Sequence, residues 1–231
     1  HLKSLDTLGI IPIRNRQFEG HNWSLFEYDG KKVIDHLISN CEDTQNLNHL
    51  VVTTSNKEII DYLQTKYESD DFLTVIRRPE KLEAYDIKLT NTINLVLENY
   101  QNQHEAIALV SIEYPFIDAA LIDEALDTLN IFNSESLISV KSSKGPFYRH
   151  NGKTLKAILD QDKYTSYERE ALYQSIGGLM VSTLEAFKKN NSLIGERVSH
   201  LLVNDKNSFG VLTDFQFRLF KLMVENKILQ N

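Results

Sequence analysis

The chain begins with a short apolar run that leads into a long polar segment, and this order constrains the fold most. The run Leu8–Ile13 is bounded by turn-forming residues, which predicts a buried strand. Residues 14–30 show no apolar period, and helical spacing begins only at Val33. A buried strand followed by a long loop and a helix is typical of open α/β sheets, which bind ligands at the carboxyl ends of their strands. We therefore expect residues 14–30 to form the rim of a binding site, with an ordinary surface loop as the alternative.

The same alternation of strand-like and helix-like segments continues along most of the chain. Asn56 and Asp118 are the expected N-caps of two of the helices. This order predicts βαβ units and a mostly parallel sheet, hence an α/β fold. The expected elements are a helix over 32–40, a strand over 50–54, a helix through 66, a strand over 72–76, a helix over 89–100, a strand over 106–112, a helix to 129 and a strand over 136–140.

The pattern changes in the last third of the chain. Asn151-Gly152 predicts the turn of a hairpin over 145–158, and the polar stretch 164–172 is expected to be exposed. Because no flexible linker occurs, we expect a single domain over 1–231, with a hairpin excursion at about 143–175. The remaining expected elements are a strand over 175–181, a helix over 183–189, a strand over 201–203 and a helix over 214–226 that turns Phe217, Leu219, Phe220 and Met223 inward.

The bulk composition and the missing motifs exclude several classes of function. The net charge is −7 and no basic block occurs, which disfavours a nucleic-acid surface but allows a small anionic ligand held by a few local cations. Cys41 is the single cysteine, and neither a signal peptide nor a membrane-length apolar run is present, so we expect a cytoplasmic protein with no membrane partner. The motifs GxSxG, GxxxxGKS and GxGxxG are absent, which disfavours hydrolases, P-loop kinases and dinucleotide dehydrogenases.

Several segments, taken together and in order, resemble the cytidylyltransferases that activate acidic sugars. These are the CMP-sialic acid (acylneuraminate) synthetases, with the CMP-Kdo synthetases as a more distant relation. The resemblance spans nearly the whole chain, and the ordered set is more specific than any one motif. The segments are IIPIR at 10–14 for the family's IIPAR, GKKVIDH at 30–36 for GKPLIEH, VVTTSNKEI at 51–59 for VVSTDDEEI, RPEKL at 78–82 for RPxxL, IEYP at 112–115 for PTSP or GDEP, SV at 139–140 for VSV, and LIGERV at 193–198 for LIGEKV.

This resemblance implies a fold and a reaction. The fold is a Rossmann-like nucleotide-diphospho-sugar transferase fold with a mostly parallel mixed sheet, helices on both faces and a hairpin excursion that joins homodimers. The substrates are CTP and an acidic 2-keto sugar, and the products are a CMP-sugar and pyrophosphate. The anomeric hydroxyl attacks the α-phosphorus, while Mg²⁺ and cationic side chains neutralise the phosphate charge.

The resemblance also assigns candidate site residues. Arg14, which matches the family motif, and Arg16, which adds a second charge nearby in the divergent loop, are the candidate catalytic cations, and Glu113 with Asp214 would hold the metal. Substrate contacts are implied for Glu113, Lys141 and Gly177. Nucleotide contacts are implied for Ile11, Pro12, Arg14, Thr54 and Arg78.

Most of these candidates also have a structural alternative. Arg14 is either a phosphate ligand or a structural arginine that caps a helix or forms an ion pair, and Arg77 is an alternative to Arg78 as the exposed member of its pair. Glu113 either binds a metal or pairs with a core arginine. The β-branched Thr54 needs no ligand to explain its place at a strand end, and Lys141 is explained equally by solvation.

The sequence departs from the family pattern at three places. The loop GGSKGIPxKN is replaced by Asn15–Ser24, so its leading glycines and both lysines are lost, and Glu19 would repel phosphate unless it points away or holds a metal. The stretch from Ile176 to Met180 replaces the sugar-site motif NGAIY, keeping a glycine but losing its Asn and Tyr, and Gly210 with Leu212 stands where metal-binding aspartates are expected. These losses leave two rival hypotheses: a family member that binds nucleotide, sugar or a protein without catalysis, and an enzyme with a changed nucleotide or sugar.

Overall fold

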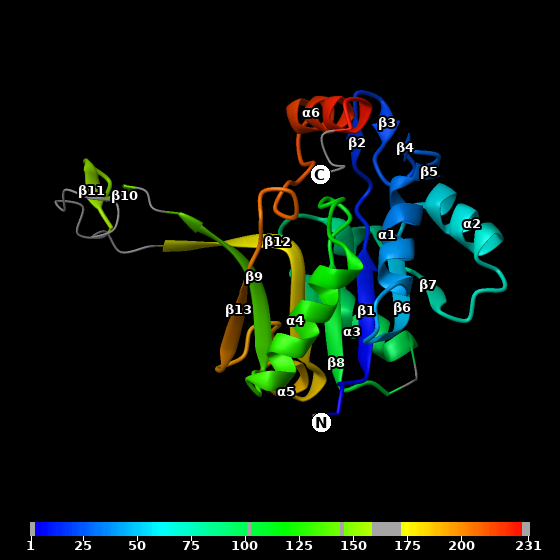
Figure 1. Cartoon of the computed structure of the whole chain (residues 1–231), viewed down its shortest axis with the longest axis horizontal. Coiled ribbons are helices and arrows are strands. Elements are labelled where there is room, and N and C mark those ends of the chain that lie inside the picture. Colours follow the sequence, from blue (N-terminus) through cyan, green and yellow to red (C-terminus); the bar gives the residue numbers. More distant parts are fainter. Residues whose placement is uncertain (1–2, 101–102, 144–145, 159–171, 228–231) are drawn as a thin grey trace.

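The computed structural model of the protein is built on one seven-stranded sheet (Figure 1). It describes residues 3–100, 103–143, 146–158 and 172–227. The strands are β1 (Thr7–Pro12), β6 (Leu47–Thr54), β7 (Leu73–Arg77), β8 (Ala106–Val110), β9 (Ser136–Ser143), β12 (Leu172–Thr183) and β13 (Val198–Leu202). Their order is β13-β9-β12-β8-β1-β6-β7, and every neighbouring pair is parallel except that β12 is antiparallel to β8 and β9. The predicted α/β class with a mostly parallel mixed sheet is confirmed.

Helices cover both faces of this sheet. They are α1 (Val33–Glu42), α2 (Lys57–Lys66), α3 (Leu89–Asn99), α4 (Ala119–Ile131), α5 (Leu184–Asn190) and α6 (Asp214–Glu225), with a short 3-10 helix η1 (Glu80–Glu83). Because successive side chains of a strand point to opposite faces, β1 separates two cores. Ile11 packs in the core that includes α1, α2, α4 and α6, whereas Leu8 and Ile10 pack in the core that includes α3 and α5.

Helix starts follow the sequence closely, because local side chains cap them. The Asn56 side chain accepts a hydrogen bond from the Ile59 N–H at 3.0 Å, and Asp118 accepts one from the Leu121 N–H at 2.9 Å. Both predicted N-caps are therefore confirmed. The inward face predicted for α6 is wrong at Leu219, which is 36 % exposed.

The segment over 14–30 is more ordered than predicted. It folds into two small hairpins, formed by β2 (Gln17–Phe18) with β3 (His21–Asn22), and by β4 (Glu27–Tyr28) with β5 (Lys31–Lys32). Trp23 between them is 1 % exposed and packs edge-on against Phe217 and Phe220 of α6. These aromatic contacts fix the segment between β1 and α6 (Figure 1).

The predicted hairpin near Asn151 is also present. Strands β10 (Tyr148–His150) and β11 (Leu155–Ala157) pair antiparallel, and the Asn151 side chain accepts the N–H groups of Lys153 and Thr154 at 3.1 and 2.9 Å. Figure 1 shows this hairpin beyond the ends of β9 and β12, away from the centre of the sheet. The predicted exposed stretch 164–172 lies almost wholly outside the described residues, so the excursion at 143–175 and the single domain over 1–231 stay predictions.

One further expectation concerns membranes. Within the described ranges, the helices are all too short or too polar to cross a bilayer.

Candidate active site

A cavity of about 340 Å³ opens at the carboxyl edge of the parallel strands. This is the edge at which open α/β sheets bind their ligands. It collects residues that follow β1, β7 and β8 and residues of β12, which are far apart in the sequence. Its lining consists of Pro12, Arg14, Arg16, Arg78, Leu89, Leu109, Ser111, Glu113, Tyr114, Gly177 and Leu212.

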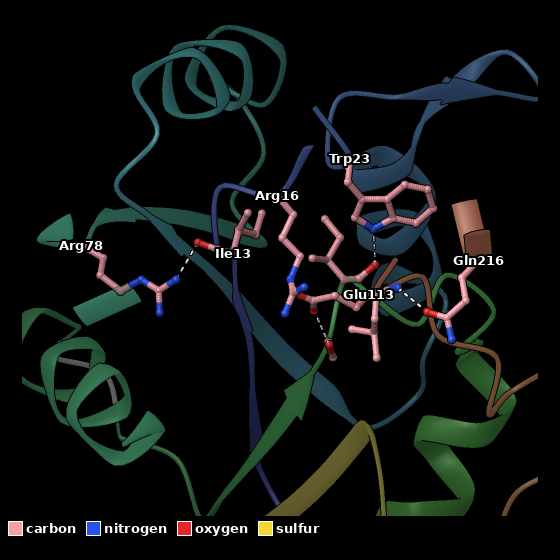
Figure 2. Close-up of polar contacts among 9 residues, drawn as sticks. Ile13, Arg16, Trp23, Arg78, Glu113 and Gln216 are labelled. Atoms are coloured by element: carbon pink, nitrogen blue, oxygen red, sulfur yellow. Dashed lines mark hydrogen bonds and ion pairs between the residues drawn. The ribbon is translucent and has the colours of Figure 1, made fainter. Parts of the chain in front are cut away.

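Arg78 forms the innermost cationic wall of the cavity and is 1 % exposed. Its guanidinium donates to the Ile13 carbonyl at 2.5 Å, as Figure 2 shows, and to the Thr92 hydroxyl at 3.1 Å. The Nε atom faces a Glu83 oxygen at 3.5 Å. Burial lowers the pKa of the Arg78 guanidinium, but an arginine keeps its charge in proteins. Arg78 therefore fixes the end of β1 and adds positive charge beneath the cavity.

Arg16 is held over the end of β8 by a carboxylate. Its Nε donates to Glu113 Oε1 at 2.9 Å, and the Ser111 hydroxyl donates to Glu113 Oε2 at 2.5 Å (Figure 2). The Trp23 indole N–H donates to the Ile112 carbonyl at 2.9 Å, which ties the segment that carries Arg16 to the segment that carries Glu113. The position of this guanidinium is therefore set by both backbone and side-chain contacts.

Arg14 differs from the other two cavity arginines in its partners. Among the residues the structure describes, it has no carboxylate within ion-pair distance. Its guanidinium lies 4.8 Å from the centre of the Tyr85 ring, and that of Arg16 lies 5.5 Å from the same ring. Arg16 pairs with Glu113 and Arg78 with Glu83, and the described lining of the cavity holds three arginines against one carboxylate, an excess of positive charge. Such a site favours an anionic ligand.

The far wall of the cavity is formed by Tyr114, a residue that the sequence interpretation did not single out. Its ring fits against glycines, because a Cβ at Gly178 would lie 3.0 Å from Tyr114 Cγ, and one at Gly210 would lie 3.0 Å from Tyr114 Cε1. Leu212 completes this wall, and its N–H donates to the Gln216 side chain at 2.8 Å (Figure 2). The paired glycines 177–178 were the available signal, but nothing local indicates which ring they accommodate.

The structure brings Pro12, Arg14, Arg16, Arg78, Glu113 and Gly177 together, as predicted, but it places two of the predicted nucleotide contacts elsewhere. The Ile11 side chain is fully buried in the core below the site. Thr54 is also fully buried, and its hydroxyl accepts the Asn56 N–H at 3.2 Å at the start of α2. Neither side chain lines the cavity, because strand alternation turns the first into the core and the helix start engages the second.

The predicted substrate contact Lys141 does not reach the cavity either. Its ammonium group pairs with Asp205 at 2.6 Å, and the side chain is half exposed. This contact lies on β9, two strands away from β8 in the sheet. The solvated alternative for Lys141 therefore describes its surroundings better.

The predicted metal ligands do not assemble a metal site. The Asp214 carboxylate accepts the Glu19 N–H at 3.2 Å and is not part of the cavity lining. Both oxygens of Glu113 accept hydrogen bonds from Arg16 and Ser111. Within the described ranges, no three His, Cys, Asp or Glu side chains lie close enough together to share a metal ion. The donor set therefore does not fit a Mg²⁺ ion held by the protein alone.

The Glu19 carboxylate, which would repel phosphate in this loop, points away from the cavity. It pairs with Arg218 and with Lys221, the latter at 3.0 Å, on α6. These hydrogen bonds hold the pKa of Glu19 below its ordinary value. Of the two arrangements that the sequence allowed for Glu19, pointing away from the phosphate site or holding a metal, the structure shows the first.

Comparisons with known proteins identify the family of the chain. The family model described as cytidylyltransferase matches residues 24–177, more than half of the chain, beginning just after the segment of Arg14 and Arg16. A comparison with curated protein sequences finds no match.

Solved structures share the fold at low sequence identity. One is described as 4-diphosphocytidyl-2C-methyl-D-erythritol synthase (TM-score 0.67, 12% identity, covering 95% of this chain and 99% of that one). Another is the same kind of synthase from Anaerococcus prevotii DSM 20548 (TM-score 0.68, 12% identity, 98% and 97%). A third is CMP:2-keto-3-deoxy-manno-octonic acid synthetase in complex with CTP (TM-score 0.65, 11% identity, 96% and 99%). The family match, on a fold shared with these synthases, shows that the chain belongs to the cytidylyltransferase family and is a cytidylyltransferase-like nucleotidyltransferase.

Proposed function

We propose that this protein transfers the cytidylyl group of CTP to an acidic sugar of the nonulosonic class. The observation that carries the proposal is the cavity at the carboxyl edge of the sheet, in which Arg14 has no carboxylate partner among the described residues. The choice of an acidic sugar is supported by the ordered segments that resemble CMP-sialic acid synthetases, from Ile10 to Val198.

In this reaction the anomeric hydroxyl oxygen of the sugar forms a bond with the α-phosphorus of CTP. The bond between that phosphorus and the oxygen bridging to the β-phosphorus breaks, pyrophosphate leaves, and the hydroxyl proton passes to solvent. Charge builds up on the phosphate oxygens during this transfer. Arg14 and Arg16 are placed to stabilise that charge, and Arg78 adds to the positive potential from below.

Tyr114 and Gly177 form the wall available to the acceptor sugar. A phenol and a backbone without a side chain present an aromatic surface with one polar group, which suits the faces and hydroxyls of a sugar. Mg²⁺ and a homodimer joined through the hairpin stay predictions from the family resemblance.

The test is isothermal titration of the protein with CTP. Removing a charged partner from a charge-assisted hydrogen bond costs about 1.5–3 kcal/mol, so Arg14→Ala is expected to raise the Kd for CTP about tenfold or more. Arg197→Ala is the matched control, since this arginine is 62 % exposed and precedes β13 at the opposite edge of the sheet. Absence of heat at millimolar CTP in the unmodified protein would contradict the proposal.

A second candidate function is binding without catalysis. It is favoured by Glu113, whose two oxygens are engaged by Arg16 and Ser111, and by Gly210 and Leu212, which supply no carboxylate. Pyrophosphate release from CTP with any member of a panel of nonulosonic acids would rule this candidate out. CTP binding with no release across the panel would favour it over the enzyme.

A further inference from the structure

Among the described residues that line the cavity, Glu113 carries the one carboxylate, and it is already paired with a cation of the chain itself. The residue is 9 % exposed. Arg16 Nε lies 2.9 Å from Oε1, and the Ser111 hydroxyl lies 2.5 Å from Oε2. A carboxylate this well buried needs a cationic partner, and in this protein that partner is a guanidinium.

The same guanidinium keeps hydrogen-bond donors free for a ligand. Of the five N–H groups of an arginine, only the Nε–H of Arg16 has an acceptor among the described residues. Arg16 belongs to the cavity lining together with Arg14. A group that is bound to a carboxylate on one side and presents positive charge to a ligand on the other performs the two tasks of a bridging divalent cation.

We infer that the Arg16 guanidinium takes the place of a divalent cation at Glu113, so that nucleoside triphosphate binds without an added metal ion. The inference rests on the proposed function for its choice of ligand. It is carried by the contacts of Glu113 and by a donor set that does not fit a protein-held metal.

The experiment is titration with CTP in two buffers, one with EDTA and one with Mg²⁺. The Kd of the unmodified protein is expected to differ by less than about threefold between the buffers, since the resident charge is present in both. In EDTA, Arg16→Ala is expected to bind CTP about tenfold or more weakly than the unmodified protein does. In Mg²⁺ it is expected to regain affinity for CTP, because Glu113 is then free to hold the ion. The double variant Arg16→Ala with Glu113→Gln removes that ligand, so it is expected to show no recovery.

Three controls keep the outcomes distinct. Arg16→Lys keeps the positive charge, so its affinity for CTP is expected to stay independent of Mg²⁺. This variant separates the effect of losing the charge from the effect of losing the fold. Arg197→Ala is expected to behave as the unmodified protein does. Electron paramagnetic resonance with Mn²⁺ and no nucleotide provides a readout that does not need CTP: Arg16→Ala gains a weak, Glu113-dependent ion, and the unmodified protein binds none at Glu113.

The inference is overturned if the unmodified protein needs Mg²⁺ to bind CTP, if Mg²⁺ fails to rescue Arg16→Ala, or if Mn²⁺ binds the unmodified protein and is lost in Glu113→Gln. If CTP gives no heat in either buffer, the proposed function fails instead. The Mn²⁺ measurement then tests the remaining part of the inference, that Arg16 takes the place of a cation at Glu113.

Discussion

At the scale of single residues, Tyr85 is a largely exposed aromatic side chain that contacts two arginines of the site. It is 77 % exposed, and its ring lies against the guanidinium groups of Arg14 and Arg16 at 4.8 and 5.5 Å. Cation–π contacts at exposed sites contribute about 0.5–1 kcal/mol each, so Tyr85→Ala is expected to weaken CTP binding about fivefold through loss of arginine alignment. Titration calorimetry measures this change.

Two substitutions control the Tyr85 prediction. Tyr85→Phe keeps the ring and is expected to bind CTP normally. Phe132→Ala removes a similarly exposed ring, 70 % exposed at the end of α4, and is expected to have no effect. A loss in Tyr85→Phe equal to that in Tyr85→Ala would show that the hydroxyl, and not the ring, is what matters.

Glu42 gives a second prediction at this scale, on stability and pH. A hydrogen bond with Asp70, helped by partial burial, raises the pKa of Glu42 from 4.5 to about 7. Between these values the folded protein holds a proton that the unfolded chain has lost, so the free energy of unfolding falls as pH rises through this window. Glu42→Gln removes the effect. As pH is raised from about 4.5 to 7, the melting temperature of Glu42→Gln is expected to increase relative to that of the unmodified protein. A difference between the two melting temperatures that does not change with pH would contradict this assignment.

At the scale of elements, α6 holds the segment that carries the site arginines. Phe217 is fully buried and packs against Phe18 and Phe26, with ring centres 5.8 and 4.9 Å apart. Phe217→Ala is expected to reduce the free energy of unfolding by about 3–5 kcal/mol. It is also expected to weaken CTP binding, because Arg16 then loses its support. Urea unfolding and calorimetry measure the two effects.

Phe215 on the same helix is the matched control, since it is 69 % exposed. Phe215→Ala is expected to change the stability by less than about 0.5 kcal/mol. Equal losses in Phe215→Ala and Phe217→Ala would show that α6 is not packed on the segment as described.

The two adjacent glycines of β12 provide a second matched pair. A Cβ at Gly178 would crowd Tyr114 Cγ and Cβ at 3.0 and 3.1 Å, and these atoms are held close to the backbone. A Cβ at Gly177 would lie at an ordinary 3.6 Å from the same ring. Gly178→Ala is therefore expected to reduce the free energy of unfolding by about 1–3 kcal/mol in a urea titration, and Gly177→Ala by clearly less. The reverse order would contradict the packing of Tyr114.

Elements governed by local signals were predictable from sequence, and elements governed by distant partners were not. The caps Asn56 and Asp118 act within three residues of themselves, so their helices start where predicted. The segment around Trp23 owes its order to Ile112 and to the aromatic side chains of α6, about ninety and two hundred residues away. The antiparallel direction of β12 likewise leaves no mark on its apolar pattern.

At the scale of the whole molecule, the sheet topology places site residues that are far apart in the sequence next to one another. Residues that follow parallel strands meet at one edge of the sheet, and Arg14, Arg78 and Glu113, which the family resemblance assigned to the site, line one cavity there. The rule does not apply to Lys141, which lies within β9 and not after its end, and its ammonium group pairs with Asp205. Tyr85 and Tyr114 were not predicted as site residues, because their roles depend on which side chains and glycines their rings contact in the fold.

The central claim is that the triphosphate of CTP binds at the carboxyl edge of the sheet, against guanidinium groups in place of the family's lysines. A crystal soaked with CTP tests this most directly. The account predicts electron density for the nucleotide in the cavity lined by Arg14, Arg16 and Arg78, with phosphate oxygens in hydrogen-bond contact with Arg14. Nucleotide bound elsewhere, or a cavity that stays empty at saturating CTP, would contradict it.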